Sequence, residues 1–515
     1  MSVTYQKKYW LRYTIAHFFS NNLSYPKFSG LSKIQVKLVS LLAGVLVALF
    51  LYFVNPFHVA EPAARVLAVA GLMITWWVSE ALPMPVVALL PLVLFPLLKI
   101  NTMKSTAASY GNEVIFLFMG GFMLGLAIEK WNLHRRIALN IVKATGTSGN
   151  RIILGFILAT GFLSMWLSNT ATTMMMFPIA LSVIKVMGDK QEGGNYAHFN
   201  LSIMLAIAWS SNFGGIATII GTPPNVQFVG YFERKYNVNI DFVDWMILCT
   251  PLALILMFAL YLLTTKVLFP NRIRSSEAAR KHIHGEIALL GKLSGPEKRV
   301  LLVFSVTALL WIFKDLINLS QSMFKLDDNM IAIMGGLALF IFPAGKTEQT
   351  GGKNKAEGLL EWSDTKELAW GILILFGGGI ALADAMEKAG LITQLGAWLA
   401  QYAGGGIFLL FMVTFLSIFI SEVMSNVAQV IVFSPVVCSL ADSIGMNPLL
   451  LGIPMTLAAS CASMLPMGTP PNAIVFASGH IRLKQMIKAG LVMNIVALVL
   501  ITLFSWYLLP LLMKN

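Results

Sequence analysis

Long apolar runs alternate with short polar segments along nearly the whole chain. Most runs reach the roughly 20 residues that a helix needs to cross the hydrocarbon core of a bilayer. Their approximate bounds are 38–55, 64–82, 84–100, 113–129, 151–187, 199–220, 243–269, 299–319, 329–343, 369–388, 405–440, 447–466 and 485–512. This pattern is typical of a polytopic membrane protein built from helices.

Four segments do not fit a simple crossing. The runs 151–187 and 405–440 are too long for one span and contain a Ser-Asn pair midway, which predicts a helical hairpin that enters the membrane and returns on the same side. The segments 199–230 and 447–477 contain GTPPN, and we predict a helix broken at that loop because proline lacks an amide donor and glycine frees the backbone. The predicted fold class is all-α, with about 11 transmembrane helices and two re-entrant hairpins.

The breaks occur in matching places of two halves. SNTATTMMMFPIA begins at 168 and SNVAQVIVFSPVV at 425, about 257 positions apart; the GTPPN loops begin at 221 and 468, about 247 apart. FMGGFMLGLAIEK from Phe118 is echoed by FGGGIALADAMEK from Phe376, and these glycines predict close helix packing. Paired broken segments of this kind indicate the binding site of a secondary transporter built from repeats.

These motifs divide the chain into two halves. We predict a first repeat at 63–269 with its hairpin at 148–190, and a second repeat at 298–512 with its hairpin at 404–443. An odd number of crossings separates matching elements, so the two repeats are inverted relative to each other.

Composition and charge agree with a membrane protein. The chain is 57% hydrophobic and 12% charged, with a mean hydropathy of +0.75, whereas a soluble domain carries about 25% charged residues. The net charge of +13 does not indicate nucleic-acid binding, because the basic residues lie in loops between apolar runs. The three cysteines, Cys249, Cys438 and Cys461, lie in or beside apolar runs without metal or disulfide spacing, and we interpret them as packing residues.

Loop charge predicts the orientation. Residues 1–37 hold six lysines and arginines and no acid, so this segment is predicted to be cytoplasmic, followed by a first membrane helix at 38–62. The basic segment 270–297 is predicted to be a cytoplasmic loop as well. With eleven crossings the C-terminus lies outside the plasma membrane.

The broken segments offer groups for a cation and an anion together. Carbonyls at the C-terminal end of one half-helix suit a cation, and amides at the N-terminus of the next suit an anion. Asn169 and Asn426 each add a carbonyl oxygen and an amide donor, and Thr222 and Thr469 add hydroxyls. Oxygen ligands favour a hard cation such as sodium. Neither motif contains Lys or Arg, so bound cations must help balance an anionic substrate, which is the physical basis of symport.

The duplicated SNT/SNV and GTPPN motifs, preceded by WWVSEALP at 76–83, resemble the divalent anion/sodium symporter (DASS) family and its INDY-like di/tricarboxylate transporters. The resemblance covers about residues 38 to 512. It implies a homodimer in the lipid bilayer, with each protomer divided into a scaffold and a transport domain, and transport by an elevator-type movement of the transport domain. It also implies co-transported sodium ions and substrates such as succinate, fumarate, malate, citrate or sulfate.

Carried over to this chain, the resemblance implies two sodium sites and a substrate site between them. The first sodium site comprises Asn169 with backbone oxygens of Ser164, Ser168 and Gly221; the second comprises Asn426 with those of Ser421, Ser425 and Gly468. The substrate site comprises Asn169, Thr170, Asn426 and Val427, with Thr222 and Thr469 nearby. Val427 departs from the family's common Thr, and Gln429 stands where the first repeat has Thr172.

The function predicted is sodium-coupled uptake of a small divalent anion, most simply a C4-dicarboxylate. A citrate or sulfate symporter and a sodium-independent dicarboxylate exchanger remain alternatives. An intramembrane enzyme needs a nucleophile with a base, which neither hairpin supplies, and a channel does not call for two inverted hairpins. Glu422, four residues before Asn426, has three possible roles: proton carrier, tuning of the second cation site, or structural fixing of the hairpin, which we favour.

Overall fold

The computed structural model describes residues 33–188, 195–273, 277–345, 357–401, 404 and 406–512. The segment predicted at 1–37 lies almost wholly outside the described residues, as do 189–190 at the end of the first predicted hairpin and 405 in the second. The fold is helical, as the sequence predicted, and the one β pairing in the described ranges is an isolated bridge between Pro343 and Gly358.

The helices of the first half are α2 (Lys33–Phe53), α3 (Glu61–Val78), α4 (Met84–Val87), α5 (Leu90–Leu97), α6 (Met103–Ala108), α7 (Glu113–Lys130), α8 (Leu133–Thr145), α9 (Gly149–Ser164), α10 (Asn169–Gly188), α11 (Tyr196–Gly215), α12 (Pro223–Tyr236) and α13 (Phe242–Leu262). Those that follow are α14 (Glu277–Leu289), α15 (Gly295–Ser320), α16 (Asp328–Ile341), α17 (Trp370–Lys388), α18 (Leu391–Ala400), α19 (Ile407–Ser421), α20 (Asn426–Ser443), α21 (Leu449–Ala459), α22 (Pro470–Phe476), α23 (Leu483–Leu503) and α24 (Leu509–Leu512).

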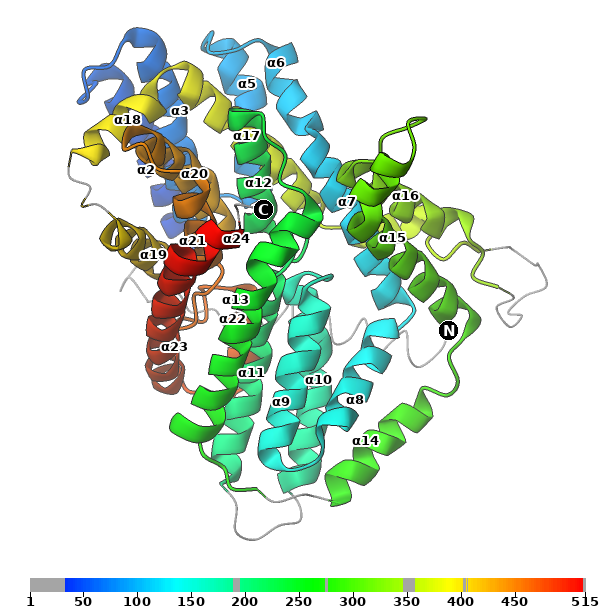
Figure 1. Ribbon diagram of the computed structural model, residues 1–515. Helices are drawn as coiled ribbons and strands as arrows, with labels where there is room; N and C mark the ends of the chain where they lie inside the picture. Colours follow the sequence, from blue (N-terminus) through cyan, green and yellow to red (C-terminus); the bar gives the residue numbers. More distant parts are fainter. Residues whose placement is uncertain are drawn as a thin grey trace.

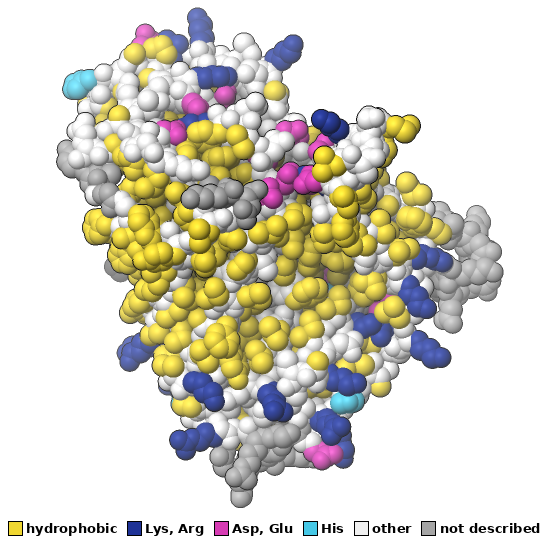
Figure 2. Space-filling view, viewed as in Figure 1, with side chains coloured by type: hydrophobic (Ala, Val, Ile, Leu, Met, Phe, Trp, Pro, Cys, Tyr) yellow, Lys and Arg dark blue, Asp and Glu magenta, His cyan; other side chains and the backbone are white. Residues whose placement is uncertain are grey.

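The helices suit a membrane. Eight of those described are long and apolar enough to cross one, among them α2, α13, α15 and α23, and six shorter apolar helices accompany them. Figure 2 shows hydrophobic side chains covering the middle of the molecule, while Lys and Arg side chains lie toward both its upper and its lower end. The number of crossings and the side on which each terminus lies stay predictions.

The repeat extends beyond the motifs that revealed it. The run of helices from α7 to α13 is matched in order by the run from α17 to α23. Each run ends in a π-helical turn, Leu263–Val267 after α13 and Phe504–Leu508 after α23. The hairpin α9–α10 lies in the lower half of Figure 1 and the hairpin α19–α20 in the upper left, as expected of inverted units.

Close helix packing depends on the predicted glycines. A Cβ added at Gly120 would lie 2.3 Å from the Ala332 carbonyl oxygen, so only glycine lets α7 approach α16 at this point. The matching glycine run in α17 is used in the same way, since a Cβ at Gly378 would lie 2.3 Å from the Ala88 carbonyl oxygen. The expectation from the sequence is confirmed at both positions.

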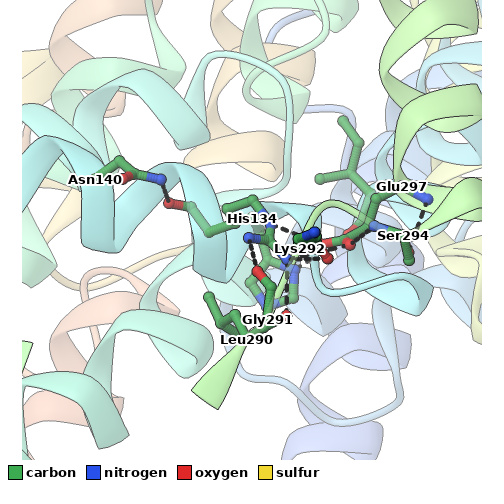
Figure 3. A network of polar contacts seen from close by, with 9 residues as sticks. His134, Asn140, Leu290, Gly291, Lys292, Ser294 and Glu297 are labelled. Carbon is green, nitrogen blue, oxygen red and sulfur yellow. Dashed lines mark hydrogen bonds and ion pairs between the residues drawn. The ribbon is translucent and has the colours of Figure 1, made fainter. Parts of the chain in front are cut away.

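The basic segment predicted as a loop contains the helix α14. Its residues Ala279 and Ile283, one turn apart, are buried. Arg136 of α8 clamps the junction between α14 and α15: its guanidinium donates to the Gly291 carbonyl (2.9 Å) and the Leu290 carbonyl (3.0 Å), and pairs with Glu297 (2.9 Å) (Figure 3). The segment after α13 is therefore tied to α8.

Candidate functional site

Each Ser-Asn pair forms the tip of a helical hairpin. The first turn separates Ser164, the last residue of α9, from Asn169, the first of α10; the second separates Ser421 from Asn426. At the first tip the Ser168 hydroxyl accepts the Ala171 amide (3.3 Å) and so satisfies a free donor of the new helix. The hairpins predicted from the sequence are present in both repeats.

Each GTPPN motif restarts a broken helix. In both repeats the first proline is the first helical residue, where a missing amide proton costs nothing. The asparagine that ends the motif then fixes the loop: the Asn225 amide nitrogen donates to the carbonyls of Gly215 (3.2 Å) and Thr218 (2.8 Å). The Asn472 amide nitrogen does the same for Ala462 (3.1 Å) and Leu465 (3.2 Å). Neither asparagine was predicted from the sequence to have this role.

The first hairpin tip and the first broken helix meet at Asn169. Its side-chain oxygen accepts the Ser164 hydroxyl (2.8 Å), and its nitrogen lies 3.4 Å from the Thr222 hydroxyl. A Cβ at Gly221 would lie 2.9 Å from the Ser164 carbonyl oxygen and 2.5 Å from that of Gly215, so this approach leaves no room for a side chain. The structure thus brings Ser164, Asn169, Gly221 and Thr222 together. The Ser168 carbonyl accepts the Thr172 amide (2.9 Å), and Thr170 is half-buried beside them.

The Asn169 amide has two possible orientations here. If it were turned by half a turn, its nitrogen would donate to the carbonyls of Gly221 (3.2 Å) and Ser211 (3.1 Å) and to the Ser164 hydroxyl (2.8 Å). Without a bound cation the turned orientation satisfies these neighbours, because an oxygen in that position would face two carbonyl oxygens. Oxygens converging on one point repel one another unless a cation lies among them, and an all-oxygen environment suits a hard cation.

The second hairpin tip is arranged differently. The Asn426 side-chain oxygen accepts the amide of the next residue, Val427 (2.9 Å), and the Ser421 hydroxyl donates to the Ala459 carbonyl (2.5 Å). Asn426 and Ser425 are half-buried, whereas Val427 and Gly468 are buried. These residues belong to the second hairpin tip and the second GTPPN loop. The Asn426 oxygen, however, accepts a hydrogen bond from its own helix and not from the loop that contains Gly468.

Glu422 fixes the second broken helix. Its side chain is 3% exposed and accepts the amides of Ser463, Met464 and Leu465, each at 2.8 Å, and the Asn494 side-chain amide at 2.6 Å. Four donors satisfy the carboxylate, so a buried charge here is accounted for by the loop it organises. These contacts support the structural role that we favoured for Glu422.

Gln429 crosses the second hairpin from one arm to the other. Its amide nitrogen donates to the Ser417 carbonyl (2.9 Å) and hydroxyl (2.6 Å), which ties α20 to α19. Thr172, at the matching place in the first hairpin, is buried, and its hydroxyl makes no hydrogen bond within the described residues. The difference between the two motifs is therefore a difference in how the hairpin arms are held.

Asn212 of α11 joins the two repeats. Its amide nitrogen donates to the Thr469 hydroxyl (3.0 Å), and its oxygen lies 3.4 Å from the Asn169 nitrogen. Asn212 lies outside both motifs and was not predicted from the sequence to be a site residue. One feature of the sequence could have pointed to Asn212. When the two GTPPN loops are aligned, Ala459 stands opposite Asn212, so the polar residue occurs in one repeat only.

Comparison with known proteins agrees with the transporter interpretation. A family model described as the sodium:sulfate symporter transmembrane region matches residues 34–513. The sodium-dependent dicarboxylate transporter SdcS of Staphylococcus saprophyticus is 37% identical over 482 residues, which cover 92% of this chain and 92% of the relative. SdcS of Staphylococcus aureus strain USA300 is 39% identical over 481 residues, covering 92% and 91%. These relatives are transporters and not enzymes.

Two solved structures share the fold at low identity. MtrF of Neisseria gonorrhoeae, from a class of antimetabolite efflux pumps, superposes with a TM-score of 0.55 at 12% identity, over 80% of this chain and 84% of its own. The YdaH transporter of Alcanivorax borkumensis superposes with a TM-score of 0.52 at 10% identity, over 88% and 99%. At such identities the likeness concerns the fold alone.

Proposed function

Because the chain belongs to the sodium:sulfate symporter family, the divalent anion/sodium symporters that its motifs resemble, we propose that it couples sodium to uptake of a C4-dicarboxylate across the plasma membrane. The observation that carries this proposal is the group of oxygens facing the Asn169 amide, where hairpin tip and broken helix meet. The names of the SdcS relatives support dicarboxylate as the substrate class and sodium as the coupling ion.

The sodium sites lie at the two hairpin tips in this proposal. Asn169 contributes its side-chain oxygen to the first cation, with the carbonyls of Ser164, Ser168 and Gly221. The second cation is held by Asn426 with the carbonyls of Ser421, Ser425 and Gly468. The two sites need not have equal affinity, because the Asn426 oxygen already accepts a backbone amide.

The substrate carboxylates lie between these sites. One contacts Asn169 and Thr170 at the start of α10, where the positive end of the helix dipole favours an anion. The other contacts Asn426 at the start of α20, with Val427 supplying an apolar wall. In this proposal the hydroxyls of Thr222 and Thr469, the N-cap residues of α12 and α22, donate to the carboxylates. Sodium at both tips offsets the two negative charges that no Lys or Arg of these motifs neutralises.

Alternating access follows from the inverted repeats. We propose an elevator movement in which the two hairpins and broken helices travel together against a scaffold, with the protein acting as a homodimer. The two hairpins lie in opposite halves of the molecule, which supports access to one site from either side (Figure 1). The homodimer rests on the family resemblance. A cytoplasmic N-terminus rests on the positive charge of residues 1–37.

Uptake of radiolabelled succinate into proteoliposomes tests the proposal. We expect an inward sodium gradient to stimulate uptake, and fumarate and malate to compete more strongly than citrate or sulfate. Uptake that ignores sodium but requires internal dicarboxylate would make the protein an exchanger. The family description names sulfate, so labelled sulfate is assayed in parallel; sodium-driven sulfate uptake without succinate uptake would keep the architecture and replace the substrate.

A further inference from the structure

Asn212 is the middle member of a buried chain of polar side chains between the repeats. It is 1% exposed, on the last turn of α11 before the first GTPPN loop. Its oxygen faces the Asn169 nitrogen (3.4 Å), and its nitrogen donates to the Thr469 hydroxyl (3.0 Å), which is 257 positions away in sequence. The chain therefore runs from the candidate cation site of one repeat to the restarted helix of the other.

The direction of the hydrogen bonds determines what Thr469 can do. Its hydroxyl oxygen accepts from the Asn212 nitrogen and from the Asn472 amide (3.4 Å). A hydroxyl has one proton to donate, and no acceptor for that proton is recorded among the described residues. While Asn212 keeps its nitrogen toward Thr469, the hydroxyl proton is available to a carboxylate of the substrate.

The orientation of Asn169 determines the orientation of Asn212. With its oxygen among the carbonyls of Gly221 and Ser211, Asn169 presents its nitrogen to the Asn212 oxygen. With the amide turned, Asn169 would present an oxygen instead, and two oxygens 3.4 Å apart would face each other without a proton between them. Asn212 removes this repulsion by turning as well, which places its own oxygen against Thr469.

The turned state of Asn212 uses the hydroxyl proton. An oxygen facing Thr469 is satisfied only if Thr469 donates to it, and the hydroxyl then has no proton left for a ligand. A cation among the oxygens holds Asn169 in the first orientation, since the turned amide would direct N–H groups at the cation. Cation occupancy at the first tip and hydrogen-bond donation by Thr469 are thereby linked through rotations alone.

We propose that Asn212 is a positioning residue that couples cation binding at the first hairpin tip to substrate binding by Thr469 of the second repeat. The inference rests on the proposed function and names the path by which sodium raises affinity for the dicarboxylate. We call the chain Asn169–Asn212–Thr469 the relay. Only the first repeat contributes a residue of this kind, because alignment of the GTPPN loops places Ala459 opposite Asn212 and alanine has no amide to turn.

Asn212→Leu tests the relay, because leucine keeps the shape of the side chain and removes both hydrogen-bonding groups. Ser202→Ala is the matched control: Ser202 is a buried residue of the same helix whose hydroxyl donates to the Thr264 carbonyl (3.0 Å), far along α11 from the relay. Purified protein is titrated with labelled succinate at several sodium concentrations, with potassium replacing sodium. Asn212→Ala provides a second variant should Asn212→Leu fail to fold.

In the wild-type protein and in Ser202→Ala, we expect the half-saturating succinate concentration to fall steeply as sodium rises. In the Asn212 variants we expect succinate to bind about tenfold more weakly at saturating sodium, which is the effect of one lost hydrogen bond, and sodium to lower that concentration much less. A residue with a purely structural role would lower thermal stability and leave this sodium dependence in place. Unchanged sodium dependence in a folded Asn212 variant overturns the relay, whereas no sodium dependence in the wild-type protein overturns the proposed function itself.

Discussion

Replacement of Glu422 by glutamine separates two roles for this carboxylate. One carboxylate oxygen accepts the amides of Ser463 and Met464 and the Asn494 side chain, and the other accepts the Leu465 amide. Glutamine keeps the first oxygen. It places an NH₂ group against the Leu465 N–H, so one bond is lost and two donors face each other.

The size of the effect follows from this geometry. A hydrogen bond to a charged group contributes about 1.5–3 kcal/mol, against about 0.5–1.5 kcal/mol for a neutral one. Removal of the buried charge also removes its desolvation cost, which offsets part of the loss. We expect the native conformation of the loop from 460 to 469 to be destabilised by about 2 kcal/mol. This corresponds to a factor of about 30 in the equilibrium constant for forming that conformation. This loop carries Gly468 and Thr469, so the half-saturating sodium concentration should rise by up to about 30-fold.

Sodium activation of succinate uptake, measured from pH 6 to pH 8, is the assay. Glu61→Gln is the control, because Glu61 is an exposed carboxylate whose ion pair with Arg65 on α3 is of a kind worth about 0–1 kcal/mol. A fixed structural role predicts weaker sodium activation with the pH dependence of the wild-type protein. Unchanged sodium activation in Glu422→Gln would refute the reasoning, and loss of pH dependence would instead assign Glu422 to proton transport.

Four further substitutions test other parts of the structure. Asn169→Ala and Asn426→Ala should each abolish sodium-dependent succinate binding and leave the melting temperature nearly unchanged; binding that survives in either variant removes that residue from its cation site. Gln429→Leu should lower the free energy of unfolding by about 1–2 kcal/mol while sodium-driven uptake persists, since it releases one hairpin arm from the other. Arg136→Lys should destabilise by about 1–3 kcal/mol and speed proteolysis between α14 and α15, because lysine lacks the fork that grips Glu297 and the loop carbonyls; equal proteolysis rates would contradict the clamp.

Much of the architecture could be predicted from the sequence because the signals are local. A Ser-Asn pair inside a run twice the length of a span leaves few structures other than a hairpin, and the second arms of the hairpins begin at Asn169 and Asn426 as expected. The duplicated motifs also predicted that the second half repeats the order of helices of the first half. The helix α14 was missed because a short helix among basic residues has no apolar run, and its buried positions Ala279 and Ile283 depend on the helices packed against it.

The internal contacts of the site could not be read from the sequence. Glu422 and its partner Asn494 are 72 positions apart, and Asn212 and Thr469 are 257 apart. Contacts at such separations depend on tertiary packing, which hydropathy and motif spacing do not encode. The orientation of the Asn169 amide depends in the same way on two carbonyls, of Gly221 and Ser211, and on the Ser164 hydroxyl. The sequence predicted that Asn169 contributes to the site, but only the structure indicates what its oxygen faces.

The central claim is that oxygens at the hairpin tips make substrate binding depend on sodium. Equilibrium binding of labelled succinate to the purified protein tests this most directly, with sodium titrated against potassium at constant ionic strength. We expect saturable binding that appears with sodium and is absent in potassium alone. Succinate binding of equal affinity in both salts would contradict the claim.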